Sequence, residues 1–217
     1  MNYKLKRILI ALTAVIAITA LLVGCSKLNS NTSSSDSSNT NSSNTVSTDT
    51  DTDSDSDTVD IDNLFTDRDM DASYDESEAE SITIADNASE SNSDNVSISG
   101  NIITISKEGI YVITGTLTDG QIVVEADEND KVQLVLSGVS INSSSSAAIY
   151  VKSADKVFIT LQEGTENTLK TSGEFVADGD TNIDGVIFSK DDITLNGSGS
   201  LTVETQYGNG IVSKDDL

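Results

Sequence analysis

The 217-residue chain contains no histidine, no tryptophan and no proline, and it has a single cysteine. Without histidine, the chain can supply neither a histidine general base nor a histidine metal ligand. One cysteine cannot form a disulfide within the chain, so the fold must be held together by its core. The absence of proline is compatible with β-strand ladders, in which every backbone N–H is needed.

Basic residues are also scarce. The chain has 12 Lys and Arg against 36 Asp and Glu, which gives a net charge of −24 at pH 7. A surface with this charge repels nucleic acid and anionic membranes at long range. We therefore exclude nucleic acid as a partner.

The N-terminal residues predict export and lipid attachment. Three of the first seven residues are basic, and an apolar run at 8–22 ends in small residues before Cys25. This is the pattern of an export signal, and it resembles a bacterial lipoprotein signal, in which the cysteine is lipidated. We predict a signal peptide at 1–25 and a diacylated Cys25 that anchors the protein to the extracytoplasmic face of the cell membrane. An uncleaved membrane anchor is the alternative, for which the run is short.

The next two segments differ in composition from the rest of the chain. Residues 26–58 are almost entirely Ser, Asn, Thr and Asp, and this segment has too few apolar side chains to offset the entropy of ordering. We predict a disordered linker there. Residues 59–95 are acidic and weakly patterned, and we predict an atypical N-terminal cap region before a repeating part at 96–217.

A recurring motif organises the C-terminal part. IFSKDD at 187–192 returns as IVSKDD at 211–216, a step of 211 − 187 = 24 residues, and runs beginning at Ile149 and Ile122 fit the same frame. Units of about 20–30 residues with short strands and no helical period are typical of solenoids. Val132, Leu134 and Leu136 show the period-two alternation of a β-strand.

We therefore predict an all-β fold, a right-handed parallel β-helix. Leu217 falls inside an expected strand with no capping segment after it, so we expect this chain to hold only the N-terminal portion of the β-helix. An antiparallel β-sandwich is the alternative, because it also gives short strands at a spacing of about 8–12 residues.

One acidic segment, ADGDTNIDG at 177–185, is a candidate calcium site. Four oxygen-bearing side chains alternate along it and could converge on one ion, and calcium prefers oxygen ligands. These four are Asp178, Asp180, Asn182 and Asp184. The spacing resembles the first half of an EF-hand loop, but Ile183 stands where that loop has glycine. A solvated acidic loop is the alternative.

Lys152, Lys190 and Lys214 occupy the same place in three successive repeats. If the repeats stack in register, neighbouring lysines in this column lie about 4.8 Å apart. Carboxylates must then lie between them to offset the repulsion, and Asp192 and Asp216 are placed to do so. Such a row could contact the hydroxyl and carboxylate groups of a linear polymer. A self-neutralised ladder that only discourages edge pairing is the alternative.

Three runs of the sequence resemble one family of bacterial cell-surface proteins. They are FTDRDMDASYDESEA, DKVQLVLSGVSINSSSSAAIYVKSADKVFITLQEGTENTL and IDGVIFSKDDITLNGSGSLTV. The family is that of carbohydrate-binding domain-containing proteins, and the resemblance covers about residues 59–217. It implies a parallel β-helix like that of pectate lyases, bound calcium, and attachment to plant-type polysaccharides that include acidic sugars.

We therefore expect a lipid-anchored surface protein that binds polysaccharide without cleaving it, with calcium as a bridge to acidic glycans. The residues expected to contact the glycan are Lys152, Lys190, Lys214, Asp192, Asp216 and Tyr207. Two other functions stay open. A pectate-type lyase would need a lysine or arginine base beside calcium, with Lys190 as the candidate, and an adhesin would bind protein partners instead.

Overall fold

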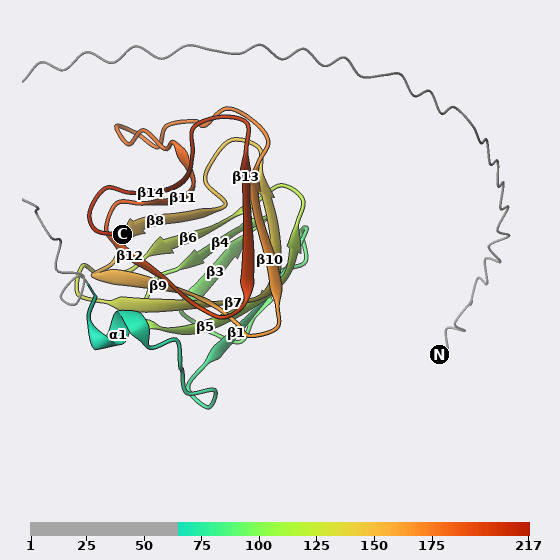
Figure 1. Ribbon diagram of the computed structural model, residues 1–217. Helices are drawn as coiled ribbons and strands as arrows, with labels where there is room; N and C mark the ends of the chain where they lie inside the picture. Colours follow the sequence, from blue (N-terminus) through green and yellow to red (C-terminus); the bar gives the residue numbers. More distant parts are fainter. Residues whose placement is uncertain (1–64) are drawn as a thin grey trace, which may run out of the picture. The chain divides into compact units, whose positions relative to one another are not determined.

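The computed structural model describes residues 65–217. The predicted signal peptide with Cys25, the predicted linker at 26–58 and the start of the predicted cap region lie outside the described residues. The described part is almost entirely β-structure, with one four-residue helix, α1 (Asp67–Met70), and strands β1 to β14 (Figure 1). No helix in this part is long and apolar enough to cross a membrane.

The strands form two sheets. Sheet A contains, in spatial order, β12 (Asp192–Gly197), β9 (Lys156–Leu161), β7 (Lys131–Ser143), β5 (Gly109–Leu117), β1 (Glu80–Ala85) and β2 (Glu90–Ser91). Within the same sheet, β10 (Glu166–Thr171) pairs with β7 and with β13 (Ser200–Thr205). Sheet B contains β14 (Asn209–Ser213), β11 (Gly185–Ser189), β8 (Ile149–Ser153), β6 (Gln121–Glu125), β4 (Ile102–Ile105) and β3 (Val96–Ser99).

The prediction of a right-handed parallel β-helix is wrong. Both sheets are mixed, because β1 pairs with β2 and β3 pairs with β4 in antiparallel orientation, while the other strand pairs are parallel. The described residues thus form two mixed sheets and not the uniform parallel solenoid that the repeats suggested. The parallel pairs likewise exclude the purely antiparallel β-sandwich.

A tight turn explains one of the antiparallel pairs. Only Gly100 and Asn101 separate β3 from β4, and a two-residue loop can join antiparallel neighbours but not parallel ones. Gly100 has a φ of 61°, which glycine adopts without strain. The sequence repeat predicts which residues are neighbours across the sheet, but it does not predict that the chain reverses direction between β3 and β4. The Gly100-Asn101 turn determines that reversal.

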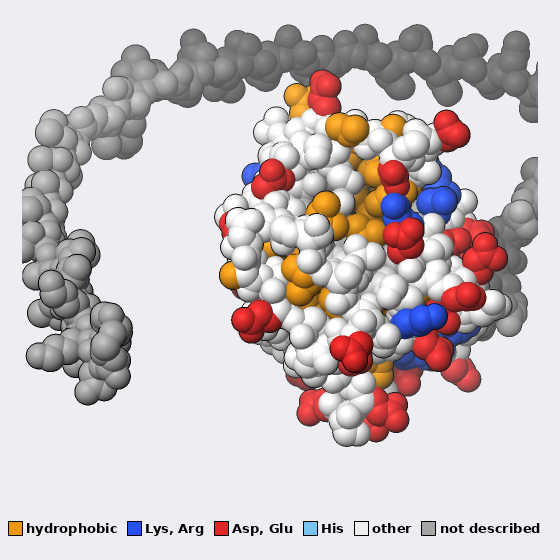
Figure 2. Space-filling view, turned by 180° about the vertical axis from the view of Figure 1, so that it is seen from behind, with side chains coloured by type: hydrophobic (Ala, Val, Ile, Leu, Met, Phe, Trp, Pro, Cys, Tyr) orange, Lys and Arg blue, Asp and Glu red, His pale blue; other side chains and the backbone are white. Residues whose placement is uncertain are grey.

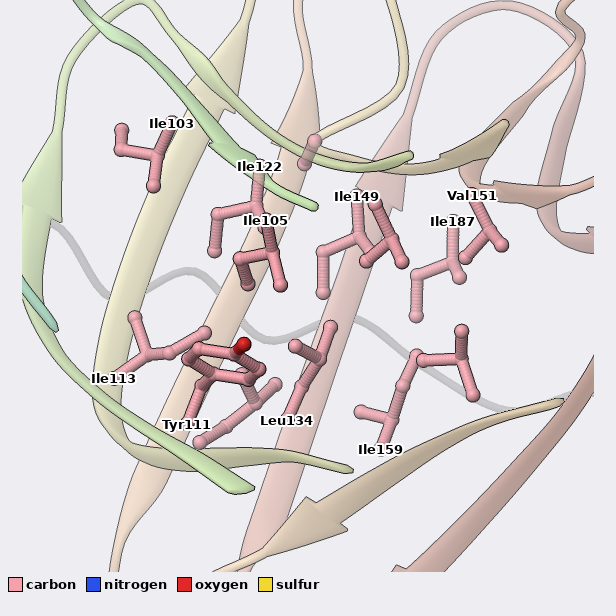
Figure 3. Close-up of a cluster of buried hydrophobic side chains, with 14 of the residues drawn as sticks. Ile103, Ile105, Tyr111, Ile113, Ile122, Leu134, Ile149, Val151, Ile159 and Ile187 are labelled. Carbon is pink, nitrogen blue, oxygen red and sulfur yellow. The ribbon is translucent and has the colours of Figure 1, made fainter. Parts of the chain in front are cut away.

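Aliphatic side chains fill the space between the sheets (Figure 3). Ile122 and Ile149 of sheet B and Leu134 and Ile159 of sheet A are among the completely buried residues of this core. Burial of each such side chain stabilises the fold by about 1.5–3 kcal/mol. Because side chains alternate along a strand, fixing these residues inward places their neighbours on the outer faces of the sheets. The candidate binding residues lie there.

The first described residues, 65–76, form a segment that we call the strap. It includes α1, which lies beside the outer face of sheet A, on the side away from β6 and β8 (Figure 1). A capping box starts the helix, because the Thr66 side chain accepts the Asp69 N–H and the Asp69 carboxylate accepts the Thr66 N–H at 2.9 Å. Asn196 of β12 donates to the backbone carbonyls of Asp69 and Asp71 at 3.2 and 3.3 Å. The strap is therefore tied to the sheet.

Replacing Ile149 with alanine should lower the free energy of unfolding by about 2–5 kcal/mol, because a fully buried side chain is lost and a cavity remains. The matched control is Ile98→Ala in β3, where the side chain is 37% exposed, and the expected cost is about 0.5 kcal/mol or less. Denaturant-induced unfolding of both variants measures the difference. Equal losses would contradict the assignment of Ile149 to the inner face.

Candidate functional site

A groove of about 320 Å³ lies on the outer face of sheet B. Residues 173–184, which we call the return segment, fold back over the strands and form one wall. The lining includes Ile102, Thr104, Val123, Glu125, Tyr150 and Lys152 from the sheet, and Val176, Asp178 and Ile183 from the return segment. Figure 2, which views the molecule from behind, shows a hollow of apolar side chains with basic and acidic groups beside it. The groove thus combines apolar and charged walls.

Four polar side chains meet in this groove. The Lys152 ammonium lies 3.2 Å from the Asp178 carboxylate and 3.9 Å from that of Glu125. The Tyr150 hydroxyl donates to the same Asp178 oxygen at 3.3 Å. Asp178 therefore orients both a cation and a phenol.

The protonation of these groups follows from their contacts. The hydrogen bond to Asp178 raises the pKa of Lys152 above its ordinary value, although burial acts in the opposite direction, and the Glu125 charge raises the pKa further. Burial and the Asp178 charge raise the pKa of Tyr150. Both groups keep their protons at neutral pH and can act as hydrogen-bond donors. A lysine held in its protonated form is unsuited to the role of general base.

Packing and backbone hydrogen bonds hold the return segment in place. The Val176 N–H donates to the Ser145 carbonyl at 2.8 Å, and Asp178 and Thr181 exchange backbone hydrogen bonds of 3.0 and 2.9 Å. Ile183 is 3% exposed and packs in a cluster with Tyr150 and Phe188, whose rings meet edge to face at 5.8 Å. These contacts fix the position from which Asp178 reaches the sheet.

The predicted calcium ligands do not converge in the structure. Asp178 pairs with Lys152, whereas Asp184 lies 3.7 Å from the Lys214 ammonium, and Asp180 and Asn182 are exposed. Within residues 65–217, no group of three or more Asp, Glu, His or Cys side chains is close enough to hold a metal ion. The arrangement therefore does not fit a calcium ion, and calcium binding stays a prediction.

The three lysines of the predicted row lie on neighbouring parallel strands. Ser189 of β11 pairs with Val151 of β8 and with Ser213 of β14, so the residues that follow these three are adjacent across the sheet. Those residues are Lys152, Lys190 and Lys214. The Lys214 N–H donates to the Ser189 carbonyl at 3.0 Å, and the Lys190 N–H donates to the Val151 carbonyl at 3.1 Å.

Two lysines of the row also lie near aromatic rings and acids. The Lys152 ammonium lies 5.8 Å from the centre of the Tyr150 ring, and that of Lys214 lies 5.2 Å from the centre of the Phe188 ring. Both distances are within the range of a cation–π contact. Lys190 is exposed and forms no ion pair with any residue from 65 to 217. It is the lysine of the row that is most open to a ligand.

The other predicted contact residues lie outside the groove. Asp192 begins β12 in sheet A, and its carboxylate accepts the Asp216 N–H at 3.1 Å. The two acids line a different hollow, which also contains Lys156. Tyr207 lies between β13 and β14 and is 44% exposed. The structure thus brings the lysines together but does not bring these three residues to them.

Sequence reasoning missed most of the groove. It gave no role to Tyr150, Ile102, Val123 or Glu125. Strand alternation could have placed these side chains on an outer face, since they alternate with buried aliphatic residues. It could not show that the return segment would cover that face, because the contact joins parts of the chain that share no local pattern.

The chain is similar to a protein of Acetivibrio thermocellus that is described as a carbohydrate-binding domain-containing protein. The two are 41% identical over 134 residues, which are 61% of this chain and 47% of the relative. The chain is also similar to a solved structure described as a polysaccharide lyase-like protein from C. thermocellum, as a gadolinium derivative. The TM-score is 0.57 at 37% identity, and the match covers 62% of this chain and 56% of that one. This chain thus spans about half the length of these relatives.

The sequence profile of one family matches residues 99–217. This range contains the groove, the return segment and the three lysines, and it begins after the strap. It is also more than half of the 217-residue chain. The chain therefore belongs to the family of carbohydrate-binding domain-containing proteins.

Proposed function

We propose that this protein binds polysaccharide in the groove of sheet B and does not cleave it. The observation that carries the proposal is the position of Lys152, Tyr150 and Asp178 against an apolar wall. A sugar ring presents hydroxyl groups at its edge and C–H groups on its faces. The groove offers partners for both.

Each part of the groove has a distinct task. Lys152 and Tyr150 donate to sugar hydroxyl oxygens, and the Asp178 and Glu125 carboxylates accept sugar hydroxyl protons. Val176 is 63% exposed and Ile102 is 43% exposed, so both can receive the C–H face of a ring. Ligand pockets usually combine an apolar lining with a few placed polar groups in this way, at volumes of about 300–1,000 Å³.

The groove is at the small end of that range, so it holds a short stretch of a polymer. Lys190 and Lys214 continue from Lys152 along sheet B and extend the contact. Repeated weak contacts along one polymer raise the overall affinity through a high effective concentration. The name of the family and that of the relative from Acetivibrio thermocellus support carbohydrate as the ligand.

Replacing Lys152 with alanine, or Tyr150 with phenylalanine, should weaken retention on the polysaccharide that the native protein binds. A lost hydrogen bond to a charged group costs about 1.5–3 kcal/mol, so the lysine variant should bind about tenfold or more weakly. Lys170→Ala is the matched control, because Lys170 also pairs with an acid, Glu204 at 3.2 Å, but lies in β10.

The measurement is co-sedimentation with a panel of insoluble glycans, with parallel ultraviolet detection of unsaturated products. Loss of retention in the groove variants alone supports the proposal. Equal retention in all variants would contradict the groove, release of unsaturated sugars would establish a lyase, and retention on protein partners without any glycan would establish an adhesin.

We further propose that calcium assists the binding of acidic glycans. The support is electrostatic, because a chain with a net charge of −24 repels a uronate polymer unless cations bridge the two. Calcium should raise retention on polygalacturonate about tenfold, the factor that corresponds to about 1.4 kcal/mol. A chelator should abolish the increase. Equal retention with calcium and with chelator would contradict this role.

We also propose that a lipid on Cys25 anchors the protein at the extracytoplasmic face of the membrane. The support is the sequence pattern at 1–25, since this segment lies outside the described residues. Cys25→Ala should move the protein from the membrane fraction to the soluble fraction of the host cell, because the lipidated side chain is gone. Membrane retention of the variant would favour the uncleaved anchor instead.

A further inference from the structure

A second arrangement for holding a carboxylate lies on sheet A, and the chain itself occupies it. The Asp69 side chain is 5% exposed although it belongs to the strap. One of its oxygens lies 2.7 Å from the Lys156 ammonium and accepts the Thr194 hydroxyl proton at 2.7 Å. The other oxygen accepts the Thr66 hydroxyl proton at 2.7 Å. Sheet A therefore provides an ammonium and a hydroxyl that together bind one carboxylate.

Polar side chains with sugar-binding chemistry continue from this point across the outer face. Gln133 of β7 donates to Thr160 of β9 at 2.9 Å, and Thr160 donates to Asn196 of β12 at 2.7 Å. The ring of Phe158 lies on the same face and belongs to neither buried hydrophobic cluster. Amides, hydroxyls and one aromatic ring are thus gathered across three neighbouring strands.

The strap covers this row through polar contacts. The Arg68 guanidinium lies 4.6 Å from the centre of the Phe158 ring and donates to Gln133 at 2.7 Å. The large apolar side chains of the strap are not anchored, since Phe65 is 55% exposed and Met70 is 73% exposed. Each polar contact of this kind contributes only about 0.5–3 kcal/mol net, because water or a ligand can replace it. Departure of the strap would therefore expose the Phe158 ring, which is 2% exposed, but not the aliphatic core between the sheets.

We propose that the outer face of β7, β9 and β12 is a second binding surface, for a carboxylate-bearing polysaccharide, and that the strap occupies it as an internal pseudo-ligand. Asp69 takes the place of a uronate carboxylate, and Arg68 covers the ring on which a sugar would stack. The proposal adds a site to the proposed polysaccharide binding and rests on it for the ligand class, but it does not use the groove of sheet B.

The change in charge and the space beside the strap both favour a carboxylate-bearing polysaccharide as the ligand of this face. When the strap leaves, Lys156 loses its carboxylate partner, and five strap acids move away together with one basic residue, Arg68. The face therefore becomes less repulsive to an anion. Two hollows of about 540 and 500 Å³ already flank the strap, one lined by Asp69, Lys156 and Thr194 and the other by Tyr74 and Gln162. A polymer can enter beside the strap before displacing it.

The test is Asp69→Asn in the complete protein, with hexagalacturonate as the acidic probe and cellohexaose as the neutral one. Without the ion pair to Lys156, residues 65–76 should exchange amide hydrogens faster. The affinity for hexagalacturonate should rise about tenfold, since a larger fraction of molecules is competent to bind. The affinity for cellohexaose should stay unchanged. The matched control is Asp67→Asn, which makes the same charge change on the exposed side of α1 and should alter neither quantity.

Two further variants separate the possible results. Lys156→Gln should also loosen the strap but should not raise hexagalacturonate affinity, because it removes the receiving ammonium. The rise in hexagalacturonate affinity should persist in a double variant that carries Asp69→Asn and Lys152→Ala, since Lys152→Ala disables only the groove of sheet B. A strap that opens without any gain for hexagalacturonate, an equal gain in Lys156→Gln, or a strap that stays closed in Asp69→Asn would overturn the proposal. Loss of the gain with Lys152→Ala would assign it to the groove.

Discussion

The structure depends on the burial of one alternating set of aliphatic side chains between two sheets. Ile122 and Val124 of β6 point into the core, so Val123 and Glu125 point out. A shift of one residue in any strand would exchange these sets, expose the aliphatic side chains and bury a carboxylate. The same packing that stabilises the fold therefore decides which residues can meet a ligand.

The scarce basic residues are used in a consistent way. The ammonium groups of Lys152, Lys156 and Lys214 each lie within about 6 Å of an aromatic ring centre, the range of a cation–π contact, and each also lies beside a carboxylate. In a chain with 36 acidic residues, a cation gathers nearby acids, and an aromatic ring limits the directions from which they approach. Each lysine is thus held in a defined place on an outer face, ready for the oxygen atoms of a ligand.

Part of this arrangement could be read from the sequence. The returning SKDD motif placed Lys190 beside Lys214, and the strands bear that register. The resemblance to carbohydrate-binding domain-containing proteins is confirmed by the family match. The β-helix was wrong because repeats describe neighbours and not chain direction, and Gly100 and Asn101 reverse the chain within one loop. The groove and the strap were not predicted, because Asp178 and Asp69 contact strands that are distant in the sequence. No local sequence period encodes such contacts.

The lysine row has a consequence for selection among polymers. The backbone spacing of the row is set by the hydrogen bonds between β8, β11 and β14, at about 4.8 Å per strand. The three lysines are therefore attached to the sheet at a constant spacing. A polymer whose oxygen groups recur at this interval, or at a multiple of it, stays in phase with successive cations, whereas one with an unrelated repeat drifts out of phase after the first contact.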